Sequence, residues 1–165
     1  MTREYAPFLA NADDIIFLFD PTQPDFNALS AARLVDLVNR VATSRKQKNL
    51  IVALSKMDEL RAHDGWAETI GSLWPDDPPS LSALPAYFQQ IDNLSQMLHL
   101  WWADPERKAQ NLINSLPPTT RFCAMSSLGH QPVKDENGIL RLTRKPEPFC
   151  VRDPLFWIFR AAGVM

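Results

Sequence analysis

Residues 14–20 read DIIFLFD and residues 49–54 read NLIVAL, and these two stretches decide the fold. Each holds an unbroken run of apolar residues rich in β-favouring types, which is typical of a strand buried on both faces of a parallel sheet. Between them, apolar residues recur at helical spacing from about residue 26 to 45, and Asp25 is placed to cap that helix. The order strand, helix, strand predicts a right-handed βαβ unit.

Further elements follow along the chain. Residues 121–125, RFCAM, predict a third strand, and residues 135–143 predict a tight turn with one arm of a hairpin. Apolar residues at helical spacing predict helices over 66–74, 84–102, 105–116 and 155–161. We therefore expect a single α/β domain over residues 1–165. It has three layers and a short, mainly parallel sheet of about three core strands, with flanking helices and a helical insertion at about 59–118.

Composition narrows the class of protein. Hydrophobic residues make up 45% of the 165-residue chain and charged residues 22%, which is typical of a folded globular domain. The net charge of -2 and the absence of a basic face argue against nucleic-acid binding. No apolar run is long enough to span a bilayer. Cys123 and Cys150 lack the spacing of a disulfide or metal motif and are interpreted as buried thiols, so we expect a cytoplasmic protein.

The second predicted strand ends in Ser55-Lys56-Met57-Asp58, at the edge where α/β folds bind ligands. Guanine presents its N1–H and its exocyclic amine side by side, and one carboxylate can accept both bonds, which adenine cannot offer. The stem of Lys56 can lie along the base while its ammonium stays in water. The competing explanation is a solvated loop in which Asp58 caps the next helix.

Three segments together resemble a known family. Residues 12–58 resemble the middle of a Ras-like, translation-factor-related GTPase domain, and residues 122–129 resemble its last base-contacting loop. Residues 151–157, VRDPLFW, resemble the closing helix of bacterial GTPases of the double-GTPase type. The resemblance implies the fold of a P-loop nucleotide-binding domain, with GTP or GDP as its ligand.

The resemblance also implies roles for single residues. Asp58 reads the edge of the base and Lys56 stacks on its face, while Ser55 takes the loop-steadying place usually held by Asn or Thr. In the second loop, Ser127 offers its backbone N–H to the guanine O6 and Ser126 braces the loop; the base-binding set there is Ser126, Ser127 and Leu128. The competing explanation for these residues is an ordinary serine-rich turn after a strand.

The chain departs from this family where phosphate is bound. It contains no GxxxxGK[ST] and no DxxG before the first strand, and none of its five glycines begins a phosphate-cradling loop. The residues that hold and cleave phosphate in P-loop enzymes are therefore missing. We expect no GTP hydrolysis by this chain on its own and assign no catalytic residue.

Other chemistry-bearing residues favour structural roles. Asp20, which Asp13, Asp14 and Asp25 could join in a carboxylate cluster, is interpreted as a cap of its own loop. The three histidines, at positions 63, 99 and 130, lack the spacing of metal ligands, so no metal site is expected. Neither Ser126 nor Ser127 lies in a GxSxG elbow, which argues against a nucleophile.

The predicted sheet also implies a partner. Three parallel strands leave an exposed edge, and exposed edges recruit other chains. We expect a protein partner or a missing N-terminal half at that edge. The first functional hypothesis is the C-terminal half of a GTPase, and the second is a non-enzymatic interaction module derived from that fold. A third is an unrelated α/β protein in which the Ser-Lys-Met-Asp motif is a coincidence. If Ser55 and Ser127 lay at opposite ends of the sheet, this third hypothesis would be favoured.

Overall fold

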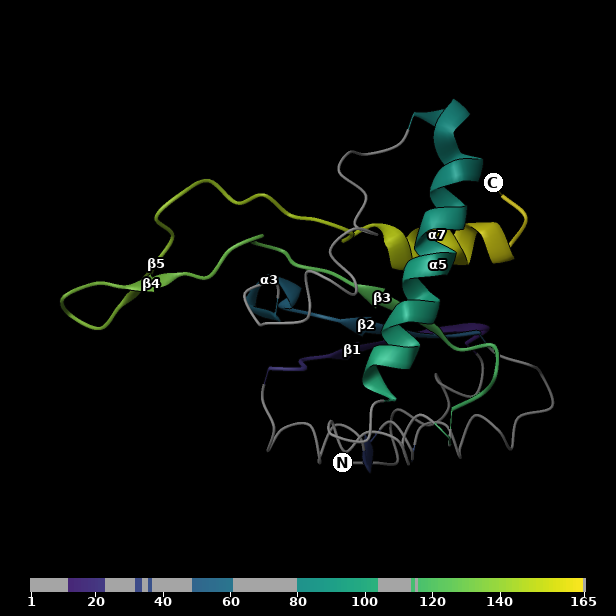
Figure 1. Cartoon of the computed structure of the whole chain (residues 1–165), viewed down its shortest axis with the longest axis horizontal. Coiled ribbons are helices and arrows are strands. Elements are labelled where there is room, and N and C mark those ends of the chain that lie inside the picture. The colour runs from purple at the N-terminus through teal and green to yellow at the C-terminus, as the bar shows by residue number, and fades with distance from the viewer. Residues whose placement is uncertain are drawn as a thin grey trace.

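A computed structural model describes residues 12–22, 32, 33, 36, 49–60, 80–103, 114 and 116–164 (Figure 1). The fold is α/β, as predicted, with a parallel three-stranded sheet, a small antiparallel pair and helices. The elements in chain order are β1 (Asp14–Phe19), β2 (Asn49–Leu54), α3 (Met57–Leu60), a 3-10 turn η2 (Leu81–Ala83), α5 (Leu84–Trp102), β3 (Arg121–Ala124), β4 (Val133–Lys134), β5 (Leu140–Arg141) and α7 (Asp153–Ala161).

Most of the predicted elements can be compared with these bounds. The strands at 14–20, 49–54 and 121–125 and the helices at 84–102 and 155–161 are confirmed. Residues 32, 33 and 36 are helical, but the remainder of the predicted helix at 26–45 lies outside the described residues. The predicted helix at 66–74 lies outside them too, as does the one at 105–116 apart from residues 114 and 116. None of the helices in the described ranges has the length and apolar character that crossing a membrane requires.

Strand β2 is the centre of the sheet. It pairs in parallel with β1 from Asp14↔Asn49 to Phe19↔Leu54, and with β3 from Ile51↔Arg121 to Leu54↔Ala124. Leu50 is 4% exposed and the four residues after it are at most 1% exposed, as expected for a central strand covered on both faces. All three strands run the same way, so their carboxyl ends meet at one edge of the sheet.

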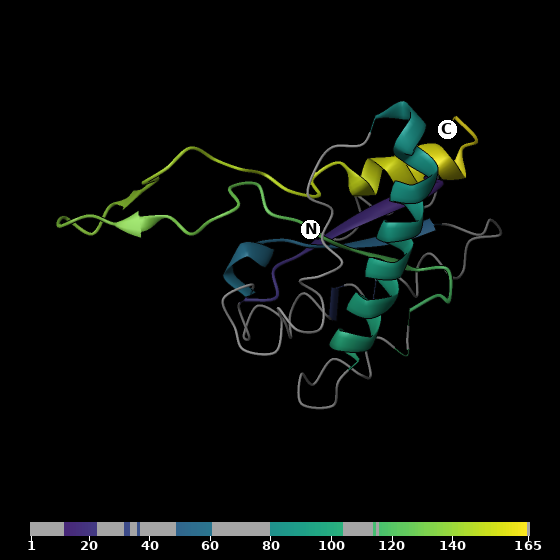
Figure 2. The same ribbon diagram turned by 45° about the horizontal axis from the view of Figure 1, so that its top comes forward.

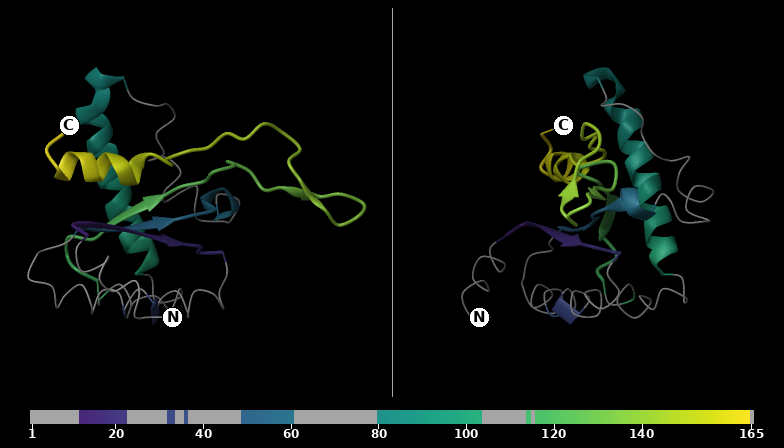
Figure 3. Two further views of the ribbon diagram at one scale, coloured as in Figure 1. Left: turned by 180° about the vertical axis from the view of Figure 1, so that it is seen from behind. Right: turned by 90° about the vertical axis from the view of Figure 1, so that its left-hand side faces the viewer.

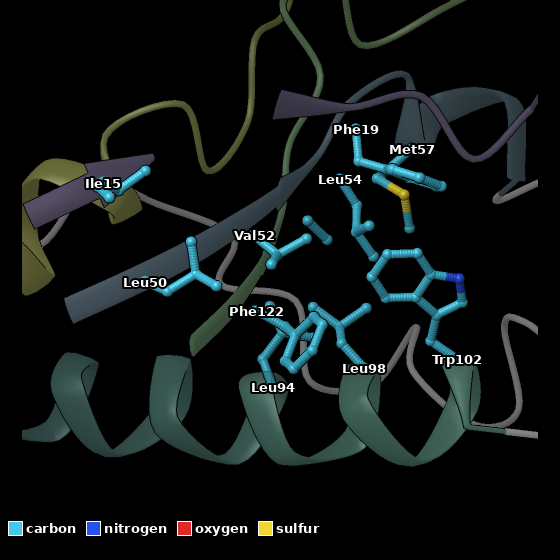
Figure 4. Close-up of a cluster of buried hydrophobic side chains, with 11 residues drawn as sticks. Ile15, Phe19, Leu50, Val52, Leu54, Met57, Leu94, Leu98, Trp102 and Phe122 are labelled. Carbon is cyan, nitrogen blue, oxygen red and sulfur yellow. The ribbon is translucent and has the colours of Figure 1, made fainter. Parts of the chain in front are cut away.

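The carboxyl-terminal half of α5 covers one face of the sheet (Figure 4). Its residues Leu94, Leu98 and Trp102 recur at helical spacing and pack on side chains from all three strands. The Trp102 ring lies 4.6 Å from the Phe19 ring and 5.7 Å from the Phe122 ring, measured between centroids. The predicted amphipathic face of this helix is therefore the main apolar contact of this layer.

The amino-terminal half of α5 packs on the other side of the sheet. Tyr87, Phe88 and Ile91 join Trp157 of α7 in a second cluster, which also includes Ile51, Ala53 and Cys123 from the sheet. Helix α5 thus crosses the outer edge of β3, as the views in Figure 3 show, and touches both faces. At the crossing, the buried hydroxyl of Ser95 accepts the Phe122 N–H at 2.9 Å. A helix therefore closes this edge of the sheet.

The prediction that β1 is buried on both faces is wrong. Ile15 and Phe19 are buried, but Ile16 is 43% exposed and Leu18 is 62% exposed. The physical reason is position in the sheet, since β1 is an edge strand and α7 packs over β2 and β3. The prediction of two buried thiols is also corrected, because Cys123 is buried whereas Cys150 is only half-buried.

The predicted turn at 135–138 is confirmed as the tip of an arm formed by residues 131–148. The Asp135 carboxylate accepts the N–H groups of Asn137 and Ile139, and the side chain of Arg141 pairs with it at 2.6 Å. Strands β4 and β5 form the hairpin, which projects away from the sheet and its helices (Figure 2).

A buried carboxyl group links α7 to α5. Asp153, in the first turn of α7, is 1% exposed and accepts a 2.6 Å hydrogen bond from the Tyr87 hydroxyl. Its second oxygen has no hydrogen-bond partner within the described residues. Burial raises the pKa of Asp153 from 3.8 to about 6, although the Tyr87 and Cys150 hydrogen bonds and the charge of Arg152 act to lower it. Ionisation of this carboxyl group is therefore unfavourable in the folded state.

This linkage gives a pH-dependent stability. Below pH 3.8 the carboxyl is protonated whether the chain is folded or not, so it adds no penalty. As pH rises to about 6, only the unfolded chain ionises readily, and the folded state loses up to about 3 kcal/mol. We expect Asp153→Asn to gain stability relative to the natural chain between pH 4 and 7, measured by urea denaturation at each pH.

Tyr87→Phe is the matched variant, because it removes the hydroxyl that donates to the Asp153 carboxylate. Removing the hydroxyl takes away a bond that favours the ionised carboxylate, so the penalty at pH 7 should become larger. If Asp153→Asn and the natural chain show parallel stability curves between pH 4 and 7, the buried carboxyl is not the titrating group.

Candidate functional site

The ends of β2 and β3 lie side by side at the carboxyl edge of the sheet (Figure 1). The Met125 N–H donates to the Leu54 carbonyl at 2.8 Å, and the Met57 N–H donates back to the Met125 carbonyl at 3.2 Å. These bonds continue the ladder past both strands and bring residues 55–58 next to residues 126–128. The two loops therefore lie at the same end of the sheet. Loops at opposite ends would have indicated an unrelated protein.

Ser55 ties this edge to the end of β1. Its N–H donates to the Phe19 carbonyl at 2.7 Å, and its hydroxyl reaches the same oxygen at 3.0 Å. A hydroxyl at this position thus steadies the neighbouring strand end, which is the local task expected of Ser55. The three strand ends form one connected edge.

Lys56 is held in an unusual backbone conformation. Its φ of 54° lies in the left-handed region, which is uncommon for a residue with a long side chain. Its ammonium contacts the Asp20 carboxylate at 2.8 Å, although the Lys56 side chain is 47% exposed. Left-handed residues in such surroundings are concentrated at functional sites, because stability alone favours glycine there.

Asp20 links the loop after β1 to the loop at 55–58 through its ion pair with Lys56. It also accepts hydrogen bonds from the N–H and the hydroxyl of Thr22 at 3.0 and 2.6 Å, so the prediction that it caps its own loop is confirmed. Burial raises the pKa of Asp20, but the hydrogen bonds from Lys56 and Thr22 outweigh it and leave the pKa below its ordinary value. The bond to Asp20 correspondingly raises the pKa of Lys56. Both groups are therefore charged at neutral pH.

Asp58 differs from Ser55 and Lys56 in that its side chain makes no hydrogen bond or ion pair within the described residues. It lies in the first turn of α3 and is half-buried, yet within the described chain neither of its carboxylate oxygens accepts a hydrogen bond. The competing explanation, in which the Asp58 side chain caps the helix, therefore finds no capping bond here.

The second loop is braced by Ser126. This residue is 2% exposed, and its hydroxyl accepts the N–H groups of Leu128 at 3.3 Å and Gly129 at 2.8 Å. Ser127, the residue after Ser126, is exposed, and no acceptor among the described residues takes its N–H. Ser126 thus holds a tight turn that leaves the Ser127 N–H open.

The base of the arm clamps this turn. Ser126 exchanges two backbone hydrogen bonds with Phe149, at 3.2 and 3.0 Å, and the Glu147 N–H donates to the Leu128 carbonyl. Gly129, with φ of 74°, lies so close to Glu147 that an added Cβ would collide with its carbonyl oxygen. The sequence reasoning did not find this clamp, and Gly129 is the signal that could have revealed a close backbone approach.

Two of the three histidines lie in the described part of the chain. His130 follows the loop and is 6% exposed, with Nδ1 3.2 Å from the Gln131 carbonyl and Nε2 without a partner in the described chain. His99 is exposed on α5, with its ring 5.5 Å from that of Phe122. Within the described ranges, no three His, Cys, Asp or Glu side chains are arranged to hold a metal ion.

Comparisons with protein families, with curated proteins and with solved structures found no match to this chain.

The two serines of the second loop allow a matched test of its structure. Ser126→Ala removes an acceptor from two N–H groups, so we expect a loss of about 1–3 kcal/mol in the free energy of unfolding. Ser127→Ala changes an exposed hydroxyl without a partner and should stay within about 0.5 kcal/mol. Urea denaturation measures both, and equal effects would contradict the bracing role of Ser126.

Proposed function

We propose that this protein is a guanine-recognition domain that binds the base of GTP or GDP between the loops at 55–58 and 126–128. The observation that carries the proposal is the meeting of these loops at one edge, with the Asp58 carboxylate and the Ser127 N–H both unpaired in the described chain. A carboxylate and a backbone donor on neighbouring loops match the donor pair, N1–H and the 2-amine, and the O6 acceptor of guanine, all of which adenine lacks.

Each side chain contributes a separate part of recognition. Asp58 accepts N1–H and the exocyclic amine of guanine, and the Ser127 N–H donates to O6. The ion pair with Asp20 holds the Lys56 ammonium at one end, so that its aliphatic stem forms one wall for the face of the base. Ser126 keeps the second loop tight enough for backbone contact.

Phosphate binding and hydrolysis are not assigned to this chain. The sequence holds neither GxxxxGK[ST] nor an upstream DxxG, so base recognition here is not accompanied by a phosphate cradle. A separate segment or chain carrying that cradle would complete a GTPase. Cys123 and Cys150 do not form a disulfide bond with each other, which favours the cytoplasm as the compartment.

A second candidate is a non-enzymatic interaction module. The observation that favours it is the outer edge of β1, which pairs with no described strand and where Ile16 and Leu18 are exposed. In this case the GTPase-like edge is retained for its shape, and partner binding does not depend on Asp58.

Nucleotide selectivity tests the first candidate. We expect GDP to bind weakly to the chain and more tightly than ADP, measured by ligand-observed NMR. Asp58→Ala should weaken GDP binding by about tenfold to a hundredfold, because it removes two charge-assisted hydrogen bonds. Asp58→Asn should instead accept xanthosine diphosphate, because xanthine has a carbonyl where guanine has the amine.

The matched control is Glu59→Gln, which neutralises the half-buried carboxylate next along α3. It should leave the preference for GDP unchanged. Equal binding of GDP and ADP to the natural chain, or no transfer of preference to xanthine in Asp58→Asn, would overturn base recognition and leave the interaction module.

A further inference from the structure

The two outer edges of the sheet differ in whether their outward backbone groups are hydrogen-bonded within the described chain. On β3, the outward N–H of Phe122 is taken by the buried hydroxyl of Ser95, and α5 covers that side. Along β1, the carbonyls of Asp13, just before the strand, and of Phe19 accept the N–H groups of Asn49 and Ser55. In a parallel ladder the residues between these turn their N–H and C=O outward. Asp14, Ile16 and Leu18 therefore present a row of backbone donors and acceptors at an edge that no described strand covers.

The same three residues share one face of the sheet. Ile16 and Leu18 are 43% and 62% exposed, next to Ile51 and Ala53 of β2, which α5 and α7 bury. The apolar surface of this face thus continues past the cover of α7 and onto β1. A strand added at the edge would bring its own side chains against Ile16 and Leu18 and extend that layer.

Charge at the edge indicates the chemistry of the added strand. At the carboxyl end of β1, Asp20 is already paired with Lys56. At the amino end, the Asp14 carboxylate accepts a hydrogen bond from the Asn49 amide at 2.8 Å and pairs with no cation in the described chain. Asp14 also lines a hollow of about 340 Å³ together with Arg121, Trp157 and Arg160. Arg160 is paired with Asp92, so a lysine or arginine beside Asp14 would give this carboxylate an ion-pair partner of its own.

A second copy of this chain fits this edge poorly. Two β1 edges related by a two-fold axis pair in opposite directions. When Ile16 lies opposite Leu18 of the second copy, Asp14 faces Asp20 of that copy, and like charges directly opposite are destabilising. When Ile16 faces Ile16, Asp14 lies opposite an aliphatic Leu18. Neither register neutralises Asp14.

We propose that the outer edge of β1 binds an extended segment of a different chain, which adds a strand to the sheet. That segment has apolar residues at alternate positions against Ile16 and Leu18, and a lysine or arginine beside Asp14. The backbone row gives the affinity, and the charge at Asp14 selects the partner. This surface does not depend on guanine recognition, because none of its residues belongs to the loops at 55–58 and 126–128.

The test uses a fluorescent peptide, Lys-Thr-Val-Thr-Val-Thr-Lys, and the same peptide with glutamate at both ends. We expect the lysine peptide to bind at least about tenfold more tightly in fluorescence anisotropy, and Asp14→Asn to reduce that preference. Binding should slow hydrogen exchange of the Ile16 and Leu18 amides. The Ile15 and Phe17 amides, which already face β2, should change little.

Two lysine substitutions distinguish peptide binding at the β1 edge from non-specific binding to any exposed leucine. Leu18→Lys should weaken peptide binding by about tenfold, whereas Leu140→Lys on β5, 60% exposed against 62% for Leu18, should not. Equal binding of the two peptides, or no protection of the Ile16 and Leu18 amides, would overturn the proposal. A dimer in sedimentation that Leu18→Lys dissociates would overturn it too, because the occupant would then be a second copy.

Discussion

The burial of the last four residues of β2 is the constraint on which the rest of the structure depends. Its last four residues, 51–54, are at most 1% exposed, so both faces must be covered and both edges must be paired. Parallel neighbours on both sides satisfy the edges, and helices α5 and α7 satisfy the faces. Because the three strands then run the same way, their ends form a single edge where polar residues accumulate.

Helix α5 makes the two sides of this sheet unequal. Because it crosses β3, its amino-terminal half packs with α7 and its carboxyl-terminal half packs on the opposite face. Ser95 lies between these halves, where a hydroxyl can satisfy the outward Phe122 N–H. No described element does the same for β1. Within the described chain, a helix therefore covers one side of the sheet, and no element covers the outer edge of β1 on the other side.

The carboxyl edge and the open side are separate surfaces that meet at Asp20. This residue directly follows the last residue of β1, and its carboxylate pairs with the Lys56 ammonium, so it lies where the edge strand and the loop at 55–58 meet. A strand added along β1 would therefore lie beside the group that positions Lys56. This contact is a physical route by which partner binding at the edge can influence the proposed base site.

The sequence by itself determined the strands, the main amphipathic helix and the positions of both loops, because apolar periodicity and turn residues act over a few neighbouring positions. Residues 55–58 and 126–128 could be singled out for the same reason. Only the tertiary structure decided that Ile16 and Leu18 are exposed, since the same apolar sequence pattern can occur in a central strand and in an edge strand. It alone decided the pairing of Lys56 with Asp20 and the clamp of Phe149 on Ser126. These contacts join residues far apart in sequence, and their geometry depends on how α5, α7 and the arm pack against the sheet.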